Sequence, residues 1–450
     1  MNHTIRNFDE LTCSELTEVT ENELRHDALA IAEAGYGAIN VGNALRRKLK
    51  IEGDELIVSP DPARCHLTET VRKHLAGRKI FFVGIGKCAF ATAVAIEEIL
   101  GEHLTNGIAF DVSSQPEQKL NKIETIVGTH PLPSEANVLA TKHIIEFLSK
   151  RTEEDLVIML ISGGGSALLC LPEAPMTYAD EVELFQELTA NGAPIQDMNI
   201  VRKHISLARG GGLARAAYPA DVVSFIASDV PGNDLTFISS GPTVRDCSTV
   251  ADAEKILVKY NVALPEGASL FETPKEEKYF ERVTNILFLS NQNALSAMQN
   301  EATRLGYVAE IVCDRFSGEA RDIGRDIVSK LHETAEKTVL LYAGESTVTL
   351  REVRPPSQGG RNQEMALVVL ADIREGELVI PFASDGHDNT DHAGAIADAL
   401  TIAHAQEKNL SADDALAAHS SYEFFSTTGD ALVTGYTGSN VSDLVVALKK

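Results

Sequence analysis

The chain contains no tryptophan, and its six cysteines are scattered without a Cys-x-x-Cys pair. Zinc ribbons and disulfide scaffolds both need paired cysteines, so the spacing argues against either and suits a reducing compartment. The start of the sequence lacks the basic segment followed by an apolar one that marks a signal peptide. No apolar run approaches the roughly 18 residues that a membrane span requires. We therefore expect a cytoplasmic protein without a membrane partner.

Basic residues are scarce, with 40 Lys and Arg against 65 Asp and Glu, and the formal net charge is −25. A free nucleic-acid-binding protein needs a basic face to neutralise phosphates, and this balance argues against one. Anionic small molecules stay open as ligands, because local lysines and arginines decide their binding. The 450 residues exceed one ordinary domain, and a hydrophobic content of 44% suffices for large cores, so two or three domains are expected.

Continuous apolar runs alternate with helical patterns in the first part of the chain. Such runs are typical of strands buried on both faces, and the connections between them are long enough for crossover helices. The pattern predicts a Rossmann-like, doubly wound parallel α/β sheet. The expected strands are 79–83, 107–111, 123–127, 156–161 and 221–228, and the expected helices include 21–50 with a break at 35–37, 88–100, 135–149 and 178–191.

Proline and glycine punctuate a mixed charge run over residues 261–283, which marks a candidate domain boundary. A second α/β pattern follows, from a strand at 285–289 to a strand at 378–383. We therefore expect two domains. The first is an N-terminal domain over residues 1–265, and the second is a smaller C-terminal α/β domain over residues 280–450.

The sequence Ser-Gly-Gly-Gly-Ser, residues 162–166, follows the buried strand at 156–161. Glycines at the end of a strand let the backbone adopt a positive φ and approach a ligand closely. If residues 167–171 open a helix, its N–H groups and positive dipole end face this loop and can bind a phosphate or a carboxylate. The alternative is a tight strand-to-helix turn in which glycine serves packing alone. We favour the anion site.

A second glycine-rich loop, Gly-Ile-Gly-Lys-Cys-Ala at 84–89, lies between a predicted strand and a predicted helix. With Asp111 at the end of the next strand, it matches the G-x-G-x-x-A fingerprint of dinucleotide-binding folds. Lys87 inside the loop favours a different interpretation, because it brings a positive charge to a transferring phosphoryl group or to an acid substrate. The alternative is a solvated surface lysine.

Aspartates form two clusters in loops after predicted strands. Asp229 and Asp234 lie five residues apart, where both could ligate Mg²⁺, or one could accept a hydroxyl proton while the other holds the metal. Turn capping is an equally common use of aspartate. Asp385, Asp388 and Asp391 form the second cluster and also suit hard cations.

Donor-rich loops complete the set of candidate site segments. Arg202 lies in a basic stretch at 199–204, Glu345 in Gly-Glu-Ser-Thr, and Arg361 and Asn362 in Gly-Gly-Arg-Asn-Gln-Glu. Neither G-x-x-x-x-G-K-[ST] nor G-x-S-x-G occurs in the chain. The sequence therefore supports neither a P-loop nucleotide triphosphatase nor a hydrolase with a serine nucleophile.

Taken together, these loops resemble the class-II glycerate kinase family, whose C-terminal part is called the MOFRL domain. The resemblance runs in order from about residue 28 to residue 444. Each motif alone is modest, and their shared order makes the match specific. The segments that carry it are VGIGKCA (83–89), GTHPLP (128–133), ISGGGSAL (161–168), NIVRKH (199–204), SDVPGND (228–234), GEST (344–347), GGRNQE (359–364), SDG (384–386) and TGYTGSN (434–440).

The resemblance implies an ATP- and Mg²⁺-dependent kinase that phosphorylates D-glycerate at its 2-hydroxyl, in a cleft between a Rossmann-like domain and a smaller α/β domain. The family's essential lysine falls on Lys87, a key aspartate on Asp229 and an arginine on Arg361. One loop departs from the family pattern Asp-Gly-x-Asp-Gly-Pro-Thr-Asp. The segment 385–391 is one residue shorter and has Asn389 in place of Gly-Pro.

The expected roles follow from charge. Lys87 and Arg361 neutralise the substrate carboxylate or the transferring phosphoryl group, and Asp229 serves as general base or metal ligand, with Asp234 and Asp385 as further metal ligands. The exact acid, the phosphoryl donor, the nucleotide-holding domain and the assembly stay open, with a homodimer among the options. The candidate substrate- or phosphate-binding residues are Gly84, Gly86, Ser162, Gly163, Gly164, Gly165, Ser166, Arg202, Glu345 and Asn362.

Other functions compete with this hypothesis. An NAD(P)H-dependent hydroxypyruvate reductase would use the G-x-G-x-x-A loop, and a kinase could act on a related hydroxy acid. A nucleotide- or acid-binding protein without catalysis is a third interpretation, and the retained lysine, arginine and paired carboxylates weaken it. Following NADH absorbance with hydroxypyruvate alone separates the reductase from a kinase.

Overall fold

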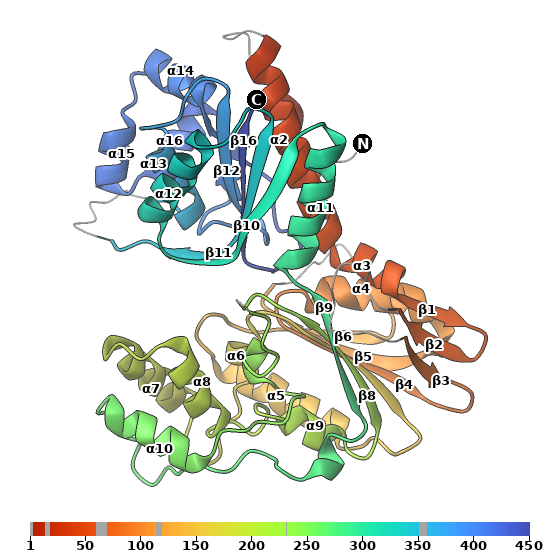
Figure 1. Cartoon of the computed structure of the whole chain (residues 1–450). Coiled ribbons are helices and arrows are strands. Elements are labelled where there is room, and N and C mark those ends of the chain that lie inside the picture. Colours follow the sequence, from red (N-terminus) through yellow and green to blue (C-terminus); the bar gives the residue numbers. More distant parts are fainter. Residues whose placement is uncertain (1–2, 14–18, 60–69, 114–118, 231, 351–357) are drawn as a thin grey trace. The chain divides into compact units, whose positions relative to one another are not determined.

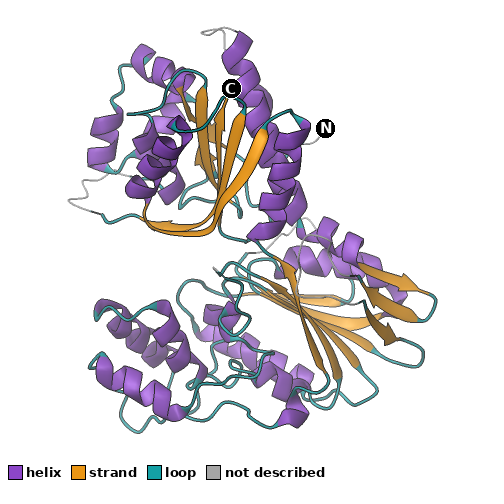
Figure 2. Ribbon diagram, in the orientation of Figure 1, coloured by secondary structure: helices purple, strands orange, loops and turns teal. Residues whose placement is uncertain are grey.

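The computed structural model describes residues 3–13, 19–59, 70–113, 119–230, 232–350 and 358–450. The chain forms two compact units. Val41–Leu289 is the central unit, and Met1–Asn40 together with Ser290–Lys450 is the terminal unit (Figure 1). Each unit combines helices with a sheet of its own (Figure 2).

A six-stranded sheet forms the core of the central unit. Its strands are β4 (Ile80–Ile85), β5 (Leu104–Asp111), β6 (Ile123–Val127), β7 (Leu156–Ile161), β8 (Asp221–Ala227) and β9 (Val283–Leu289). All neighbours pair in parallel, in the order β6-β5-β4-β7-β8-β9. Strands β4 and β7 are buried along their whole length, as continuous apolar runs predict. The order is that of a doubly wound Rossmann-like sheet and confirms the expected fold, with a switch point between β4 and β7.

The helices of the central unit are α3 (Val41–Lys48), α4 (Ala89–Leu100), α5 (Glu135–Leu148), α6 (Gly165–Leu168), α7 (Tyr178–Ala190), α8 (Ile195–Lys203), α9 (Gly212–Ala217) and α10 (Val250–Lys259). Thr177 and Thr249 begin α7 and α10 with capping boxes, in which each threonine hydroxyl accepts a backbone N–H of the first turn. The helix expected after the triple glycine is only the single turn α6. The helix dipole considered for the anion site is therefore that of a single turn.

Beside the main sheet, the central unit has a small antiparallel sheet that the sequence pattern does not predict. It consists of β1 (Leu49–Glu52), β2 (Glu55–Val58) and β3 (Val71–His74). These strands are four residues long, too short for a clear alternation of polar and apolar residues.

The terminal unit contains a mixed sheet whose strands are β10 (Val308–Glu319), β11 (Thr338–Thr347), β12 (Glu377–Ala383), β13 (Gly394–Ala395), β14 (Ala397–Asp398), β15 (Ala431–Leu432) and β16 (Asp443–Lys449). The order is β10-β11-β16-β12-β13-β15, and β14 pairs with β12. The last strand, β16, enters between β11 and β12 and runs antiparallel to both. It is therefore a central strand of this sheet, which the sequence analysis did not predict.

The helices of the terminal unit are α1 (Phe8–Leu11), α2 (Val19–Ile39), α11 (Asn291–Arg304), α12 (Ala320–His332), α13 (Arg361–Val369), α14 (Ala399–Glu407), α15 (Ala412–Ala418) and α16 (Ser421–Thr428). Helices α2 and α11 lie so close that a Cβ on Gly35 would be 2.9 Å from the sulfur of Met298. Because α2 continues through Gly35 to Ile39, the expected break at 35–37 is wrong. Among the described helices, none has the length and apolarity to cross a bilayer.

A buried ion cluster holds the N-terminal segment in the terminal unit. Arg25 on α2 donates from Nε and Nη2 to the carboxylate of Asp398, at 2.7 Å each. Its Nη1 lies 2.9 Å from Oδ1 of Asp430. The first forty residues therefore belong with the C-terminal part of the chain, whereas the sequence analysis assigned them to the N-terminal domain. The central unit also extends to Leu289, because β9 completes its sheet.

Candidate functional site

The two glycine-rich loops of the sequence meet at the switch point of the central sheet. The backbone N–H of Lys87 donates to the carbonyl oxygen of Gly163 at 2.9 Å. One residue on, the N–H of Cys88 donates to the hydroxyl of Ser162 at 3.2 Å, and that hydroxyl donates to the carbonyl of Ile85 at 3.2 Å. The carboxyl ends of β4 and β7 are thus joined directly, so the loops form one structural element.

Two glycines make this junction possible. Gly86 has φ of 108°, and a Cβ there would lie 2.4 Å from both the carbonyl and the hydroxyl oxygen of Ser162. Gly164 has φ of 84°, and a Cβ there would lie 3.3 Å from the His130 ring and 3.4 Å from Cγ of Lys87. Residues that carry a side chain rarely adopt such φ values, so glycine is favoured at both positions. At Gly86 the close approach of Ser162 is a second reason. Gly164 therefore faces both Lys87 and His130.

His130 was not among the expected site residues. It follows β6 in the GTHPLP segment, and its side chain is exposed. Asn137 holds this segment in place, since its side-chain amide donates to the carbonyls of Thr129 at 2.9 Å and Ala167 at 3.0 Å. The position of His130 after a strand of the sheet is a signal that could have identified it.

A serine pair supports the triple-glycine loop from the opposite side. Ser239 donates from its hydroxyl to the carbonyl of Ser162 at 2.6 Å. The hydroxyls of Ser240 and Ser166 lie 2.9 Å apart, and Ser240 also donates to Oδ1 of Asn199 at 3.2 Å. Ser239 and Ser240 both have positive φ, 51° and 60°. Such backbone strain costs about 1–3 kcal/mol per residue and recurs at functional sites.

Asp111 ends β5, as expected, but its carboxylate is directed at helix α4. It accepts the N–H of Phe90 at 2.9 Å and that of Val112 at 2.6 Å. The residue is 2% exposed. Burial raises the pKa of Asp111 against the hydrogen bonds from Phe90 and Val112 that favour the charged form. The first turn of α4 is thus capped by a protein carboxylate, in place of the phosphate that the fingerprint predicts.

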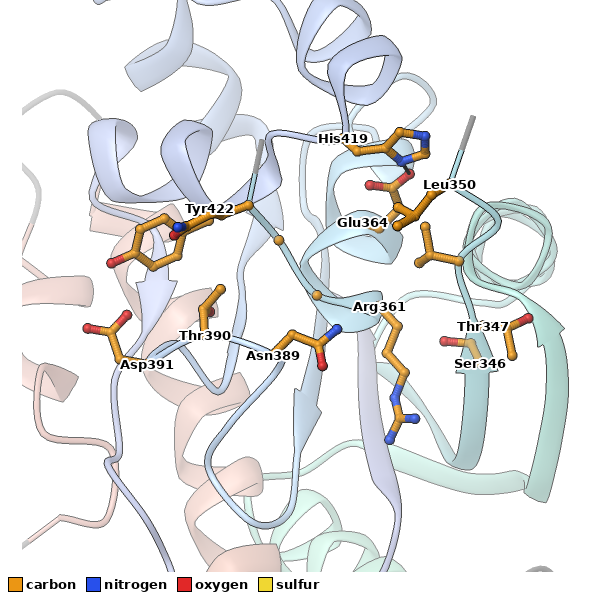
Figure 3. A pocket seen from close by; sticks show the side chains of 14 residues that line it. Ser346, Thr347, Leu350, Arg361, Glu364, Asn389, Thr390, Asp391, His419 and Tyr422 are labelled. Atoms are coloured by element: carbon orange, nitrogen blue, oxygen red, sulfur yellow. Dashed lines mark ion pairs between the residues drawn. The ribbon is translucent and has the colours of Figure 1, made fainter. Parts of the chain in front are cut away.

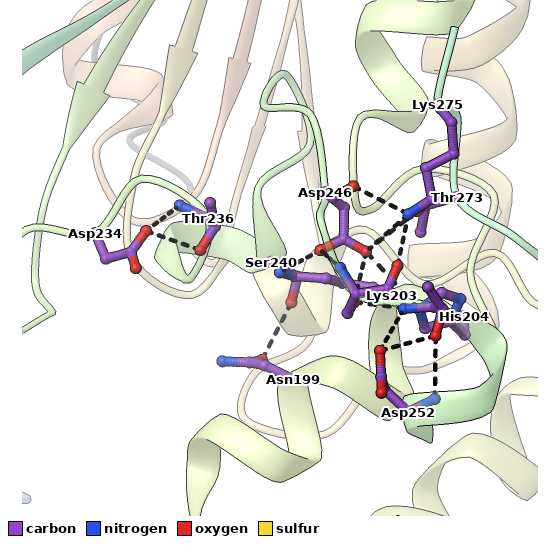
Figure 4. A network of polar contacts seen from close by, with 12 residues as sticks. Asn199, Lys203, His204, Asp234, Thr236, Ser240, Asp246, Asp252, Thr273 and Lys275 are labelled. Atoms are coloured by element: carbon purple, nitrogen blue, oxygen red, sulfur yellow. Dashed lines mark hydrogen bonds and ion pairs between the residues drawn. The ribbon is translucent and has the colours of Figure 1, made fainter. Parts of the chain in front are cut away.

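The two aspartates after β8 differ in their surroundings. Asp229 lies two residues beyond the end of β8 and is half-buried. Asp234 is exposed, and its Oδ1 accepts the backbone N–H and the hydroxyl of Thr236 at 2.9 and 2.8 Å (Figure 4). The alternative considered for this pair, turn capping, therefore describes Asp234. Pro231 between them lies outside the described residues.

The basic stretch at 199–204 divides between two environments. Lys203 contacts Asp246, with 3.1 Å between Nζ and Oδ1, in a buried network with His204 and Thr273 (Figure 4). Arg202 instead stacks on the ring of Phe185, with its guanidinium carbon 3.4 Å from the ring centroid. Lys203 is therefore a structural residue, and Arg202 is not part of that network.

The terminal unit has a pocket of about 670 Å³ at the start of α13 (Figure 3). Its wall includes Gly360 and Arg361, the end of β11 at Ser346, and the residues Asp391 and Tyr422. Glu345 is the neighbour of Ser346 on β11 and is exposed. The donor-rich loops GEST (344–347) and GGRNQE (359–364) are separated by eleven residues of sequence and thus share one pocket wall.

Arg361 is held by two carboxylates. Its Nε and Nη2 donate to Asp443 at 2.5 and 3.1 Å, and Nη2 also donates to Glu345 at 3.0 Å. Burial opposes the charged guanidinium, but Asp443 and Glu345 outweigh it and raise the pKa of Arg361. The arginine therefore reaches the pocket with its charge already balanced inside the terminal unit.

The shortened loop at 385–391 places Asp388 at the first turn of α13. Its carboxylate accepts the N–H of Asn362 at 3.1 Å and that of Gln363 at 2.8 Å, and the side-chain amide of Asn362 at 3.2 Å. A Cβ on Gly360 would lie 2.1 Å from Cγ of Asp388. Burial raises the pKa of Asp388, against the hydrogen bonds from Gln363 and Asn362. Asp388 thus caps the first turn of α13, and Asn362 donates to it from both its backbone and its side chain.

Asp385 is half-buried, and its Oδ1 accepts the N–H of His387 at 3.0 Å. In the described part of the chain, no group of three or more His, Cys, Asp or Glu side chains is arranged to hold a metal ion. A metal ion at this protein would therefore depend on one or two carboxylates together with ligand oxygens, as Mg²⁺ commonly does at nucleotide sites.

Comparison with known proteins agrees with the geometry. Residues 27–270 match a domain of unknown function, DUF4147, and residues 338–443 match the MOFRL family. A Pyrococcus horikoshii protein named glycerate 2-kinase is 35% identical over 447 residues, covering 95% of this chain and 97% of the relative. An Agrobacterium vitis protein, named provisionally as a hydroxypyruvate reductase, is 35% identical over 414 residues, 89% of this chain and 93% of its own.

A solved structure extends the comparison to the fold. The crystal structure of glycerate kinase from Thermotoga maritima matches with a TM-score of 0.80 and 30% identity, covering 93% of this chain and 98% of that one. Both halves of the sequence are thus matched, in order, by one family of two-part enzymes. The chain belongs to the glycerate 2-kinase family, whose C-terminal part is the MOFRL domain.

Proposed function

We propose that the protein is a glycerate 2-kinase, which transfers the γ-phosphoryl group of ATP to the 2-hydroxyl of D-glycerate and forms 2-phosphoglycerate. The observation that carries this proposal is the junction of the Lys87 loop with the triple-glycine loop between β4 and β7. Open α/β sheets bind ligands at this switch point, beyond the carboxyl ends of the strands. The names of the relatives supply the acid and the reaction.

In this mechanism Lys87 neutralises charge on the transferring phosphoryl group. Its backbone is fixed at Gly163, and the glycine at 164 leaves room beside its stem. A cation held in place before the reaction needs no reorganisation as charge develops, so it contributes more than a mobile surface lysine. The loop 162–166 is proposed to offer backbone N–H groups to oxygens of the same phosphates.

Asp229 is proposed as the general base. It follows β8, and β8 pairs with β7, so its carboxylate and the triple-glycine loop lie at the same edge of one sheet. In the reaction the 2-hydroxyl oxygen bonds to the γ-phosphorus, the bond from that phosphorus to the ADP oxygen breaks, and the hydroxyl proton passes to Asp229. One carboxylate in reach of the hydroxyl suffices for this transfer.

Mg²⁺ is proposed as the companion of ATP. The half-buried carboxylate of Asp385 fits this role, because Mg²⁺ at nucleotide sites takes one or two carboxylates and completes its shell with phosphates and water. Asp234 fits less well, since one of its oxygens accepts two hydrogen bonds from Thr236. Bound Mg²⁺ would neutralise part of the phosphate charge.

The pocket of the terminal unit is proposed to contribute through hydrogen bonds. Arg361 pairs with Asp443 and Glu345. It therefore neutralises less of the substrate's negative charge than an unpaired arginine would. Its guanidinium can orient a bound group, and Glu345 fixes the guanidinium. Asn362 is turned toward Asp388, so it is proposed to act on the pocket through the first turn of α13.

The reductase alternative is less well supported by the same loop. Dinucleotide-binding sheets need a free helix N-terminus for the pyrophosphate and a free acid for the ribose. Here the acid at the end of β5, Asp111, already binds the N–H of Phe90 in α4 and is buried. Each of the two groups that NAD(P)H would need is therefore occupied by the other.

A direct assay tests the proposal. ADP release from ATP should require D-glycerate, and no NADH should be consumed with hydroxypyruvate. Lys87→Met should lower kcat about 10²–10³-fold, the loss typical of one positioned charge. Lys142→Met, at an exposed lysine of α5, is the matched control and should retain full turnover. Near wild-type turnover in Lys87→Met would remove the central role given to that lysine.

The cell compartment and partners are part of the proposal as well. We place the enzyme in the cytoplasm, since its described cysteines are free thiols, which suit a reducing compartment. Its partners are then two small molecules, the hydroxy acid and ATP.

A further inference from the structure

Arg202 is a buried arginine that forms no ion pair in the described structure. It lies on α8, is 9% exposed, and stacks on Phe185 of α7 with its guanidinium carbon 3.4 Å from the ring centroid. Its Nε is buried and has no hydrogen-bond partner. Among the described residues, no carboxylate lies within ion-pair distance of its guanidinium. A buried guanidinium normally has such partners, because leaving donors unpaired costs stabilising free energy.

The neighbouring arginine shows what a paired guanidinium looks like in the same place. Arg209 donates from Nη2 to Glu181 of α7 and to the carbonyl of Ser166, at 2.6 Å each. The other oxygen of Glu181 accepts the thiol of Cys170 at 3.2 Å. The one carboxylate of this cluster is thus engaged by Arg209, and Arg202 is left over. The cluster carries one positive charge in excess.

The electrostatics agree with this count. Burial lowers the pKa of Arg202, and the nearby charge of Arg209 lowers it further, to about 9. Glu181 opposes this shift. An arginine with a fixed counter-charge shows the opposite direction, as Arg361 does beside Asp443. The ring of Phe185 offsets part of the cost through a cation–π contact. In the described structure, no ion pair compensates the remaining free-energy cost of burying this charge.

Arg202 lies next to the switch-point loops. The guanidinium of Arg209 donates to the carbonyl of Arg202 at 3.3 Å as well as to that of Ser166, so one side chain spans the distance between them. Asn199, one helical turn before Arg202 on α8, accepts from Ser240, which in turn contacts Ser166. The backbone of Arg202 is therefore part of the structure that supports the triple-glycine loop, and its side chain extends from there to Phe185.

We propose that Arg202 binds the carboxylate of the hydroxy-acid substrate and so selects acids over neutral alcohols. This inference rests on the proposed function, because that function supplies the acid. A planar guanidinium can grip a carboxylate through two parallel hydrogen bonds. The single excess charge of the cluster equals the charge of one carboxylate, whereas the phosphates of ATP carry several. Lys87 is then left to the phosphoryl group.

Arg202→Met tests the assignment, because methionine keeps an apolar stem against Phe185 and removes the charge. The KM for D-glycerate should rise at least about 30-fold, the loss expected when one partner of a buried charge pair is removed. The KM for ATP should stay within about twofold. Arg202→Lys, which keeps a charge without the fork, should fall between wild type and methionine. Arg215→Met, at an exposed arginine of α9, is the matched control.

Thermal melting supplies a readout independent of turnover. Without ligand, Arg202→Met should melt at or above the wild-type temperature, since it removes an unpaired buried charge. D-glycerate alone should raise the melting temperature of the wild type and of Arg215→Met, but not that of Arg202→Met. A large loss of stability in the unliganded variant would overturn the proposal, because it would mean that Arg202 has a structural partner.

The kinase assignment and the carboxylate site can fail separately. If D-glycerate stabilises the wild type through Arg202 but is not phosphorylated, the carboxylate site stands and the kinase assignment falls. If D-glycerate is phosphorylated and Arg202→Met leaves its KM unchanged, the kinase stands and the carboxylate site falls. A rise in the KM for ATP instead of D-glycerate would assign Arg202 to the nucleotide and overturn the proposal as well.

Discussion

Gly86 and Ser162 approach each other so closely that a Cβ on Gly86 would lie 2.4 Å from two oxygens of Ser162. This contact fixes the relation between β4 and β7 at the switch point. Glycine is required at position 86 for two reasons. A Cβ would collide with Ser162, and the φ of 108° is one that other residues rarely adopt.

Gly86→Ala should therefore disturb both stability and activity. We expect a loss of about 2–5 kcal/mol in the free energy of unfolding, from backbone strain and overpacking together. Gly53→Ala is the control, since Gly53 in the β1–β2 turn has φ of 58° but no atom within 4 Å of the place where a Cβ would lie. It should cost only about 1–2 kcal/mol. Urea unfolding of both variants measures the difference, and equal losses would contradict the close approach.

The Arg25 cluster makes a prediction about the terminal unit. Arg25→Met leaves Asp398 and Asp430 buried without their cation, and should lower the free energy of unfolding by about 3–5 kcal/mol.

A fragment of residues 41–289 should fold alone with cooperative unfolding, whereas residues 290–450 should need the first forty residues. Denaturant unfolding of the variant and the fragments checks both. A stably folded 290–450 fragment would contradict the assignment of α2 to that unit.

Asp246 should give the central unit part of its pH dependence. Burial opposes its charge, but Lys203 and Ser248 outweigh burial and hold the pKa of Asp246 below its usual range. Its stabilising contribution is therefore present above the ordinary aspartate pKa of about 3.9 and is lost as pH falls through the lower folded-state pKa. Between about pH 5 and 3, the free energy of unfolding should fall more steeply in the wild type than in Asp246→Asn. Parallel curves would refute this.

The pair of Arg361 and Asp443 is expected to couple strongly. Arg361→Met should destabilise the protein by about 3–5 kcal/mol because it leaves Asp443 unpaired. Adding Asp443→Leu should restore much of that loss, since the buried carboxylate is then gone as well. A double-mutant cycle in urea measures the coupling. Additive losses would show that the two side chains do not depend on each other.

Local sequence patterns were sufficient for five of the six strands of the central sheet and for its two glycine-rich loops. Continuous apolar runs identify the strands, and glycines after β4 and β7 identify the switch-point loops. Each of these patterns can be recognised from a segment of about ten consecutive residues. The parallel order then brings Lys87 and residues 162–166 together. These parts of the architecture depend on short-range information.

The remaining features depend on contacts that sequence spacing does not show. The place of α2 rests on Arg25, which binds a carboxylate 373 positions away, and β16 enters its sheet from the far end of the chain. Asp111 and Asp388 look like ligand groups in the sequence, yet each caps a helix of the protein. The unpaired state of Arg202 appears only when its neighbours are in place.

Phosphorus NMR of the product formed from ATP and D-glycerate identifies the hydroxyl that receives the phosphoryl group. The carbon that carries the 2-hydroxyl bears one proton, so after transfer to this hydroxyl the new resonance should be a doublet in the proton-coupled spectrum. With Lys87→Met it should grow about 10²–10³-fold more slowly. A triplet, from transfer to the 3-hydroxyl, or no new resonance with the wild-type protein, would contradict the assignment of a glycerate 2-kinase.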